Sequence, residues 1–173
     1  MSAPPPAGAA GLGGERADLL QTLDKHRGFL RFTVRDLTDE QAARRTTVSA
    51  LSLGGLIKHV AGTEAVWTRF MVGGADAMAS DPADWEAQFR MAEGETLVGL
   101  LAGYEQVAAA TDTLVLSLPD LEQAHPLPAA PWFEPGAVWS ARRVLLHIIA
   151  ETAQHAGHAD IIRESLDGAR TMG

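Results

Sequence analysis

The sequence of 173 residues contains no cysteine. This absence excludes disulfide bonds, and it also excludes a thiolate ligand or thiolate nucleophile supplied by the protein itself. Any thiol chemistry carried out by this chain therefore requires that the sulfur arrive on a ligand.

Positive charge and long apolar runs are also scarce. The 14 Lys and Arg residues stand against 22 Asp and Glu residues, which gives a formal net charge of −8. Binding to a nucleic-acid backbone needs clustered basic side chains, so we expect no nucleic-acid partner. No uninterrupted apolar run reaches the length of about 18 residues that a membrane span needs, and the start lacks the features of a secretory signal. We therefore expect a cytoplasmic protein with no membrane partner.

Composition divides the chain into three parts. Residues 1–14 are mostly Pro, Gly and Ala, a composition that cannot bury a core and predicts a disordered tail. Residues 15–168 repeat apolar side chains at helical spacing and show no sustained alternation, so we predict one all-α domain without a sheet. Residues 169–173 form a short C-terminal tail.

Helix start and stop signals predict four long helices and one short helix. Thr38 and Gln41 have the spacing of a capping box at the start of the short helix. The segment 117–137 contains five prolines and forms a long connection before the last helix. This arrangement predicts a four-helix bundle with a long crossover connection. The expected bounds of the long helices are about 15–34, 52–73, 94–111 and 140–167.

His59 lies in the middle of an apolar face of the second long helix. At about 100° per residue, Trp67 and Phe70 project within roughly a quadrant of His59, whereas Lys58 projects away from it. His59 should therefore point into the bundle, where burial favours the neutral imidazole that binds metals. We predict that Trp67 and His26, on the inner side of the first helix, line a binding pocket there; for His26 a packed core position is the alternative.

A second histidine stripe lies on the last helix. His147, Glu151, His155 and His158 follow one another at helical spacing, among apolar residues such as Ile148. A buried carboxylate is costly without a partner, so Glu151 requires a cation or a hydrogen-bond network. Because Glu151 and His155 are four residues apart, they share a helix face and can reach one ion.

His59, Glu151 and His155 together predict a site for a divalent metal with two nitrogen ligands, one carboxylate and an open coordination position. A buried polar network without metal is the alternative. The donor set suits zinc first, with nickel, iron or manganese as other options. We predict that His158 is a catalytic acid or base; a fourth ligand or a partner that orients the site are its other roles. His147 can orient Glu151 from one turn away.

Two segments carry a family resemblance. SLGGLIKHVAGTEAVW and LLHIIAETAQHAGHADIIRESLDG resemble the DinB-like (YfiT-like) metal-binding four-helix bundles, and the resemblance extends over about residues 15–168. It implies an up-down-down-up bundle, with a metal-ligand histidine on the second helix that matches His59. It also implies a Glu-x-x-x-His pair on the last helix that matches Glu151 and His155.

The resemblance also implies a function. The better understood relatives include a mycothiol-dependent maleylpyruvate isomerase and bacillithiol or mycothiol S-transferases. We therefore expect a metal-dependent S-transferase or thiol-dependent isomerase that uses a low-molecular-weight thiol, mycothiol, and a small electrophile. The alternatives are a hydrolase that uses metal-activated water and a non-catalytic metal-binding or small-molecule-binding stress protein. The resemblance also suggests a homodimer.

Overall fold

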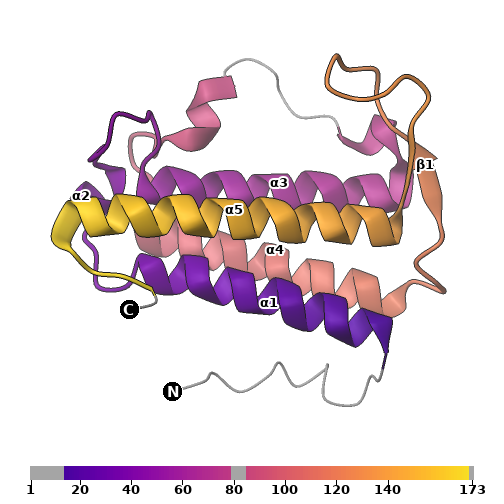
Figure 1. Cartoon of the computed structure of the whole chain (residues 1–173), viewed down its shortest axis with the longest axis horizontal. Coiled ribbons are helices and arrows are strands. Elements are labelled where there is room, and N and C mark those ends of the chain that lie inside the picture. Colours follow the sequence, from indigo (N-terminus) through magenta and orange to yellow (C-terminus); the bar gives the residue numbers. More distant parts are fainter. Residues whose placement is uncertain (1–13, 79–84, 172–173) are drawn as a thin grey trace.

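The computed structural model of the protein describes residues 14–78 and 85–171, and within these ranges four long helices form a bundle (Figure 1). The predicted disordered tail lies outside the described residues, apart from Gly14. The long helices are α1 (Glu15–Thr33), α3 (Leu53–Gly73), α4 (Leu97–Ser117) and α5 (Ala141–Asp167). The short elements are α2 (Asp39–Ala43), the 3₁₀-helices η1 (Ala75–Met78) and η2 (Trp85–Phe89), and the strands β1 (Ala124–Pro126) and β2 (Val138–Ser140).

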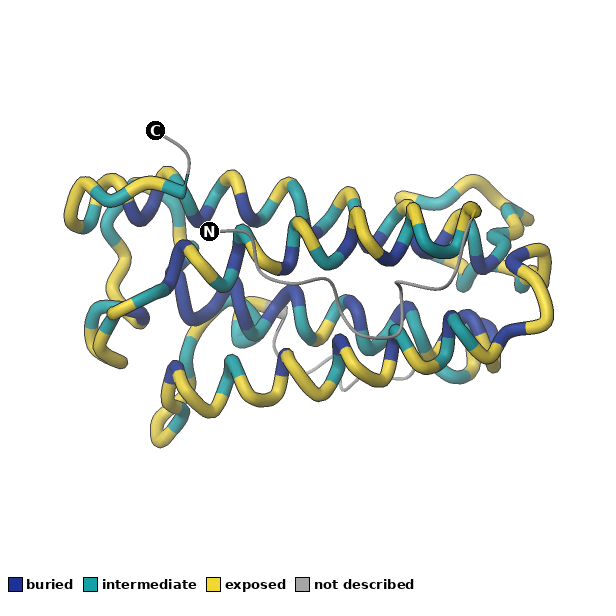
Figure 2. The backbone as a smooth tube through the Cα atoms, turned by 90° about the horizontal axis from the view of Figure 1, so that it is seen from below, coloured by how far each residue is buried: buried dark blue, intermediate teal, exposed yellow. Residues whose placement is uncertain are grey.

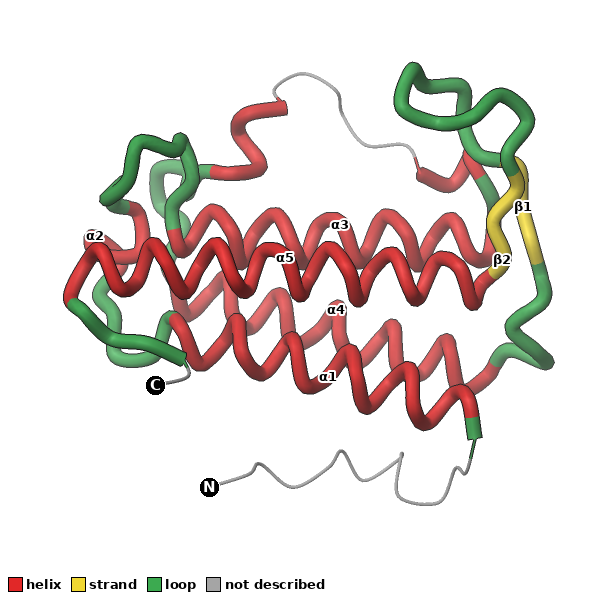
Figure 3. The backbone as a smooth tube through the Cα atoms, in the orientation of Figure 1, coloured by secondary structure: helices red, strands yellow, loops and turns green. Residues whose placement is uncertain are grey.

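The helix directions confirm the up-down-down-up order. α1 and α5 run in one direction along the bundle, and α3 and α4 run in the other (Figures 1 and 3). α5 packs against both α1 and α3, and α3 packs against α4, whereas α1 and α4 touch only lightly. Within the described ranges, no helix is long and apolar enough to cross a membrane.

Most of the predicted helix ends are confirmed by their caps. Thr38 and Gln41 form the reciprocal capping box at the start of α2. Ser52 caps α3, and its hydroxyl accepts a hydrogen bond from the Gly55 amide at 3.3 Å. α5 ends at Gly168 in the left-handed conformation (φ 79°), which glycine adopts without a steric cost.

α4 differs from its predicted range. It begins at Leu97, after the Thr96 cap, and continues past the predicted end near residue 111 to Ser117. The added turns bury Val115 in the core. Burial of that side chain outweighs the low helix propensity of the β-branched residues near it, which local sequence reasoning cannot weigh.

The prediction that the chain contains no sheet was wrong. β1 and β2 pair as an antiparallel ladder in which His125 lies opposite Trp139. Each strand has three residues, which is too short for an alternating pattern to stand out in the sequence. Their pairing closes the Pro-rich segment between α4 and α5 into a loop at one end of the bundle (Figure 3).

The long crossover is present, but it is not the Pro-rich segment. α4 ends and α5 begins at the same end of the bundle, so the Pro-rich segment stays there (Figure 1). α3 ends where α4 also ends, so the connection between α3 and α4 must return to the opposite end. η1 lies beside the end of α3, and η2 lies beside its beginning.

The core has two apolar clusters, one toward each end of the bundle, and buried residues recur along all four long helices (Figure 2). Tyr104, the tyrosine of α4, is fully buried in one cluster. Representative members are Leu23, Phe70, Val115 and Ile148 in one cluster, and Leu30, Leu56, Tyr104 and Ile162 in the other.

A polar layer lies between the two clusters. Arg27 of α1 and Glu64 of α3 are 1% and 0% exposed and form a bidentate ion pair, with Arg27 Nε 3.2 Å from Glu64 Oε2. Arg27 Nη1 also donates to Asp112 Oδ1 of α4 at 2.9 Å. On α5 the layer is completed by buried Thr152, whose hydroxyl donates to the Ile148 carbonyl. Three helices are therefore held at one level by a single guanidinium.

We expect Glu64→Gln to lower the free energy of unfolding by about 3 kcal/mol, because it removes the buried countercharge of Arg27 and leaves only the partly exposed Asp112 beside the guanidinium. Urea denaturation of the metal-free protein measures the effect. The matched control is Glu40→Gln, which removes the exposed Glu40–Arg44 pair and should change the free energy by no more than about 0.5 kcal/mol. Equal effects of the two substitutions would contradict a special role for the buried pair.

Candidate metal centre

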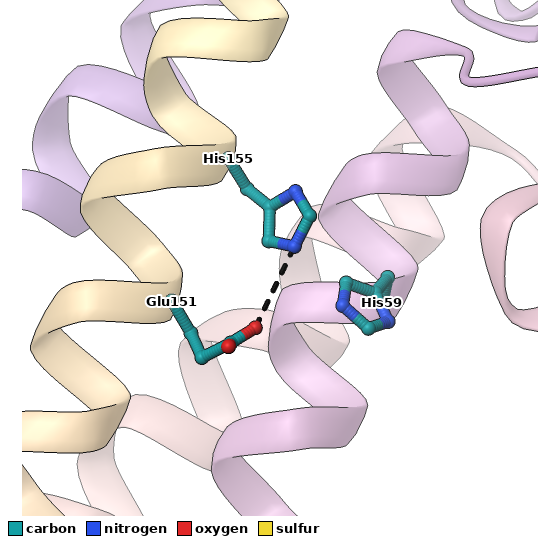
Figure 4. Close-up of side chains that lie close together, drawn as sticks. All are labelled: His59, Glu151 and His155. Carbon is teal, nitrogen blue, oxygen red and sulfur yellow. Dashed lines mark ion pairs between the residues drawn. The ribbon is translucent and has the colours of Figure 1, made fainter. Parts of the chain in front are cut away.

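Three side chains from two helices converge at the seam between α3 and α5. His59 comes from α3, and Glu151 and His155 come from α5, and one ligand atom of each lies within 4.8 Å of the others. Figure 4 shows the three side chains pointing toward one another. Glu151 Oε2 lies 3.6 Å from His155 Nε2, and the His59 and His155 rings stand edge to face with centroids 4.7 Å apart.

Helix geometry explains the convergence. Glu151 and His155 are one turn apart, so both project from the same face of α5. His59 projects from the side of α3 that packs against α5. The residue His59 is 6% exposed, and the side chains of His155 and Glu151 are 12% and 29% exposed. The cluster is therefore shielded on the His59 side and reachable from the Glu151 side.

The electrostatics favour a neutral imidazole next to an ionised carboxylate. Burial lowers the pKa of His59 below its ordinary value. The interaction with His155, followed by the nearby charges of the other histidines, lowers the pKa of Glu151 despite its partial burial. At neutral pH His59 therefore offers a lone pair and Glu151 a negative charge, which are the forms that bind a divalent cation.

Part of η2 covers His59, a contact that no sequence pattern predicted. Gln88 Oε1 lies 2.8 Å from His59 Nδ1. The Phe89 ring lies over the imidazole with a centroid distance of 4.2 Å and a tilt of 32°. A 3₁₀-helix of five residues has no periodic pattern to recognise, and its placement depends on a tertiary contact with a distant helix.

His158 lies one turn beyond His155 and outside the group of three. Its Nδ1 is 3.4 Å from His155 Nδ1, and the two ring centroids are 5.4 Å apart. The structure thus places His158 beside a candidate ligand, on the side away from Glu151. The acid–base role of His158 stays a prediction.

Trp67 belongs to an aromatic cluster two turns along α3 from His59. Trp67 stacks on Trp139 of β2 with centroids 4.9 Å apart, and the His147 ring stands edge-on to both indoles. Phe133 of the Pro-rich segment packs against the same pair. This aromatic cluster (Trp67, Trp139, His147 and Phe133) pins the segment between α4 and α5 onto the seam that carries the candidate metal centre.

His26 is not part of the converging group. It is half-buried on α1, and its ring packs edge-on against Phe29. In the described part of the chain, no hydrogen bond or ring contact joins His26 to His59, Glu151 or His155. The predicted pocket-lining roles of His26 and Trp67 therefore stay predictions.

The fold and the cluster define an all-α bundle with a candidate His-Glu-His metal centre between its second and fourth long helices. Comparison with family models gives a match to the mycothiol-S-transferase family over residues 18–168. The match covers most of the chain, and the chain belongs to this family, which is DinB-like as the sequence resemblance predicted.

A solved structure supports the fold. A crystal structure of a conserved protein from Enterococcus faecalis is similar with a TM-score of 0.69. The similarity covers 91% of this chain and 100% of that chain, at 15% identity. At this identity the similarity is evidence for the fold alone. A comparison with curated proteins gave no match.

Burial predicts a pH dependence of stability for the metal-free protein. Burial lowers the pKa of His59 and of His147, whereas in the unfolded chain each titrates near the ordinary value of about 6.5. Above that pH both states are neutral, and below it the unfolded chain binds protons that the folded chain does not. The free energy of unfolding should therefore fall as pH is lowered from about 7.5 to about 5.5.

The matched variant is His147→Asn, which removes one of the two groups and lies outside the converging group of three. Urea denaturation at the two pH values should show a smaller loss of stability in this variant than in the unsubstituted protein. An equal or larger loss would contradict the assignment to His147.

Proposed function

We propose that this chain is a divalent-metal-dependent enzyme that uses a low-molecular-weight thiol of the mycothiol type. The reaction is S-transfer to a small electrophile or a thiol-dependent isomerisation. Family membership supports the thiol, and the convergence of His59, Glu151 and His155 supports the metal. The convergence is the observation that carries the proposal, because helix packing alone does not require two imidazoles and a carboxylate to meet in a partly buried seam.

The donor set fits a divalent ion. Two ligand atoms bound to one ion at about 2.1 Å in tetrahedral geometry are roughly 3.4 Å apart. The 3.6 Å separation between Glu151 Oε2 and His155 Nε2 is close to this spacing. His59 completes the group, and three protein ligands leave an open position of the kind found in catalytic zinc sites. Zinc is our first choice, with nickel, iron or manganese as other options.

A divalent ion bound there would supply a Lewis acid that lowers the pKa of an incoming thiol. The protein contains no cysteine that could compete for such a position. In the transfer, the thiol sulfur forms a bond to an electrophilic carbon, the bond from that carbon to its leaving group breaks, and the thiol proton passes to a base. We assign the base to His158, whose ring lies next to that of His155.

We propose that the thiol and the electrophile bind at neighbouring positions along the seam between α3 and α5. The partly exposed side of the cluster, at Glu151, leads along α5 to His147 and the aromatic cluster one turn away. We propose that Trp67 and its neighbours form an apolar wall for the electrophile, and that His26 contributes from α1. The homodimer suggested by the family resemblance stays a prediction.

We expect the purified protein to hold about one divalent ion per chain, and His59→Ala to lose it. The matched control is His125→Ala, which removes a histidine whose ring packs against Phe70 away from the cluster. Elemental analysis after dialysis measures the metal in all three proteins. If the unsubstituted protein holds no metal after reconstitution, the cluster is a buried polar network and not a metal centre.

We expect the metal-loaded protein to consume mycothiol in the presence of a generic electrophile, and the metal-free protein not to. His158→Gln should keep the metal and lower kcat by about 100-fold or more, the usual contribution of a general base. Thiol consumption and calorimetric titration with mycothiol measure the two effects. Turnover without added thiol would instead indicate a hydrolase, and bound metal without thiol binding would indicate a structural or storage site.

A further inference from the structure

The segment that covers His59 lies against a pair of glycines, Gly54 and Gly55, about one turn before His59 on α3. A Cβ on Gly55 would overlap the carbonyl group of Phe89, and a Cβ on Gly54 would overlap the side chain of Met91. The Phe89 carbonyl belongs to the backbone, so the overlap at Gly55 cannot be relieved by a rotamer change. Any side chain at Gly55 would therefore force η2 away from α3.

Polar contacts flank this close approach. The Ser52 hydroxyl, which caps α3, lies 3.5 Å from the Phe89 carbonyl oxygen. Lys58 Nζ donates to the Arg90 carbonyl at 3.4 Å and pairs with Glu95 at 2.9 Å. The last residue of η2 and the residue after it are thus held against the first two turns of α3, which precede His59, and Phe89 packs on the imidazole face.

The hydrogen bond between His59 Nδ1 and Gln88 Oε1 has a defined direction. An amide oxygen has lone pairs and no proton, so Gln88 Oε1 can only accept. In the neutral imidazole of His59 the proton is therefore on Nδ1, and the lone pair is on Nε2. The remote nitrogen of His155, by contrast, faces His158, which is another imidazole and can donate or accept. His59 is the candidate ligand whose tautomer its neighbour dictates.

We propose that Gln88 is a positioning residue that holds His59 in the Nδ1–H tautomer with its Nε2 lone pair available to a metal ion. The Gly54–Gly55 pair is what allows η2 to bring Gln88 there. Partners that hold the remote nitrogen of a ligating histidine orient the ring and raise its basicity. The metal part of this inference rests on the proposed function, whereas the tautomer part concerns the protein alone.

The first measurement is the tautomer of His59 in the metal-free protein, from long-range ¹H–¹⁵N correlation spectra at a pH where the ring is neutral. The expected signature is a protonated Nδ1 and an unprotonated Nε2. Gln88→Leu should shift the ring toward a mixture of the two tautomers, and Gln88→Glu, which keeps an acceptor oxygen, should restore the original pattern. A protonated Nε2 in the unsubstituted protein would overturn the proposal without reference to any variant.

The second measurement is Zn²⁺ affinity by competition with a chromophoric chelator. Gln88→Leu should weaken binding by about 10-fold to 100-fold, the usual effect of removing such a partner, and Gln88→Glu should bind as tightly as the unsubstituted protein. The matched control is Gln106→Leu on the exposed face of α4, which should leave the affinity unchanged. Thermal unfolding of the metal-free variants separates loss of the contact from loss of the fold.

The outcomes distinguish the two claims. If the unsubstituted protein binds no Zn²⁺, the proposed function fails, and the tautomer measurement still decides the role of Gln88. If the unsubstituted protein binds Zn²⁺ and folded Gln88→Leu binds it equally tightly, the positioning role is wrong and the metal centre stands. Equal weakening in Gln106→Leu would also overturn the role of Gln88.

Discussion

The ion pair between Arg27 and Glu64 fixes the level at which the helices meet. Both groups are buried, so a displacement of α3 by one turn along α1 would leave a charge in an apolar cluster without its partner, which is strongly unfavourable. Apolar packing alone tolerates many arrangements of leucines and valines. The polar layer therefore selects one register, and Asp112 extends that selection to α4.

The candidate metal centre depends on the same register. Glu151 directly precedes Thr152 of the polar layer on α5, and His59 lies within two turns of Glu64 on α3. Two ligands come from one helix and keep their spacing as long as that helix exists. The third comes from another helix, so its position depends on how the two helices are held relative to each other. The spacing of Glu151 and His155 thus depends only on the helical conformation of α5, whereas the position of His59 relative to them depends on the packing of the core.

The sequence predicted the parts that local physics determines. The caps at Thr38, Ser52 and Gly168 and the inward direction of His59 follow from hydrogen bonding and helix periodicity. The convergence of His59, Glu151 and His155 could be predicted because burying such polar side chains on an apolar face costs free energy unless they have a common partner. β1 and β2, the connection that crosses the bundle, and Gln88 were missed, since each depends on pairing between segments that carry no periodic signal. Gly54 and Gly55 were visible in the sequence, but only the structure shows which backbone needs the space.

Because α3 and α4 run parallel, the helices that carry the candidate ligands and the segment that covers His59 belong to different parts of the fold. The ligand helices are held by the two apolar clusters and the polar layer, whereas the cover at η2 comes from the connection that parallel helices require. Changes in the length of a surface connection have a small entropic cost, and changes there leave the buried layers intact. The surroundings of His59 can therefore be altered by replacing one connection, so that the properties of the candidate metal centre and the folding stability are open to separate adjustment.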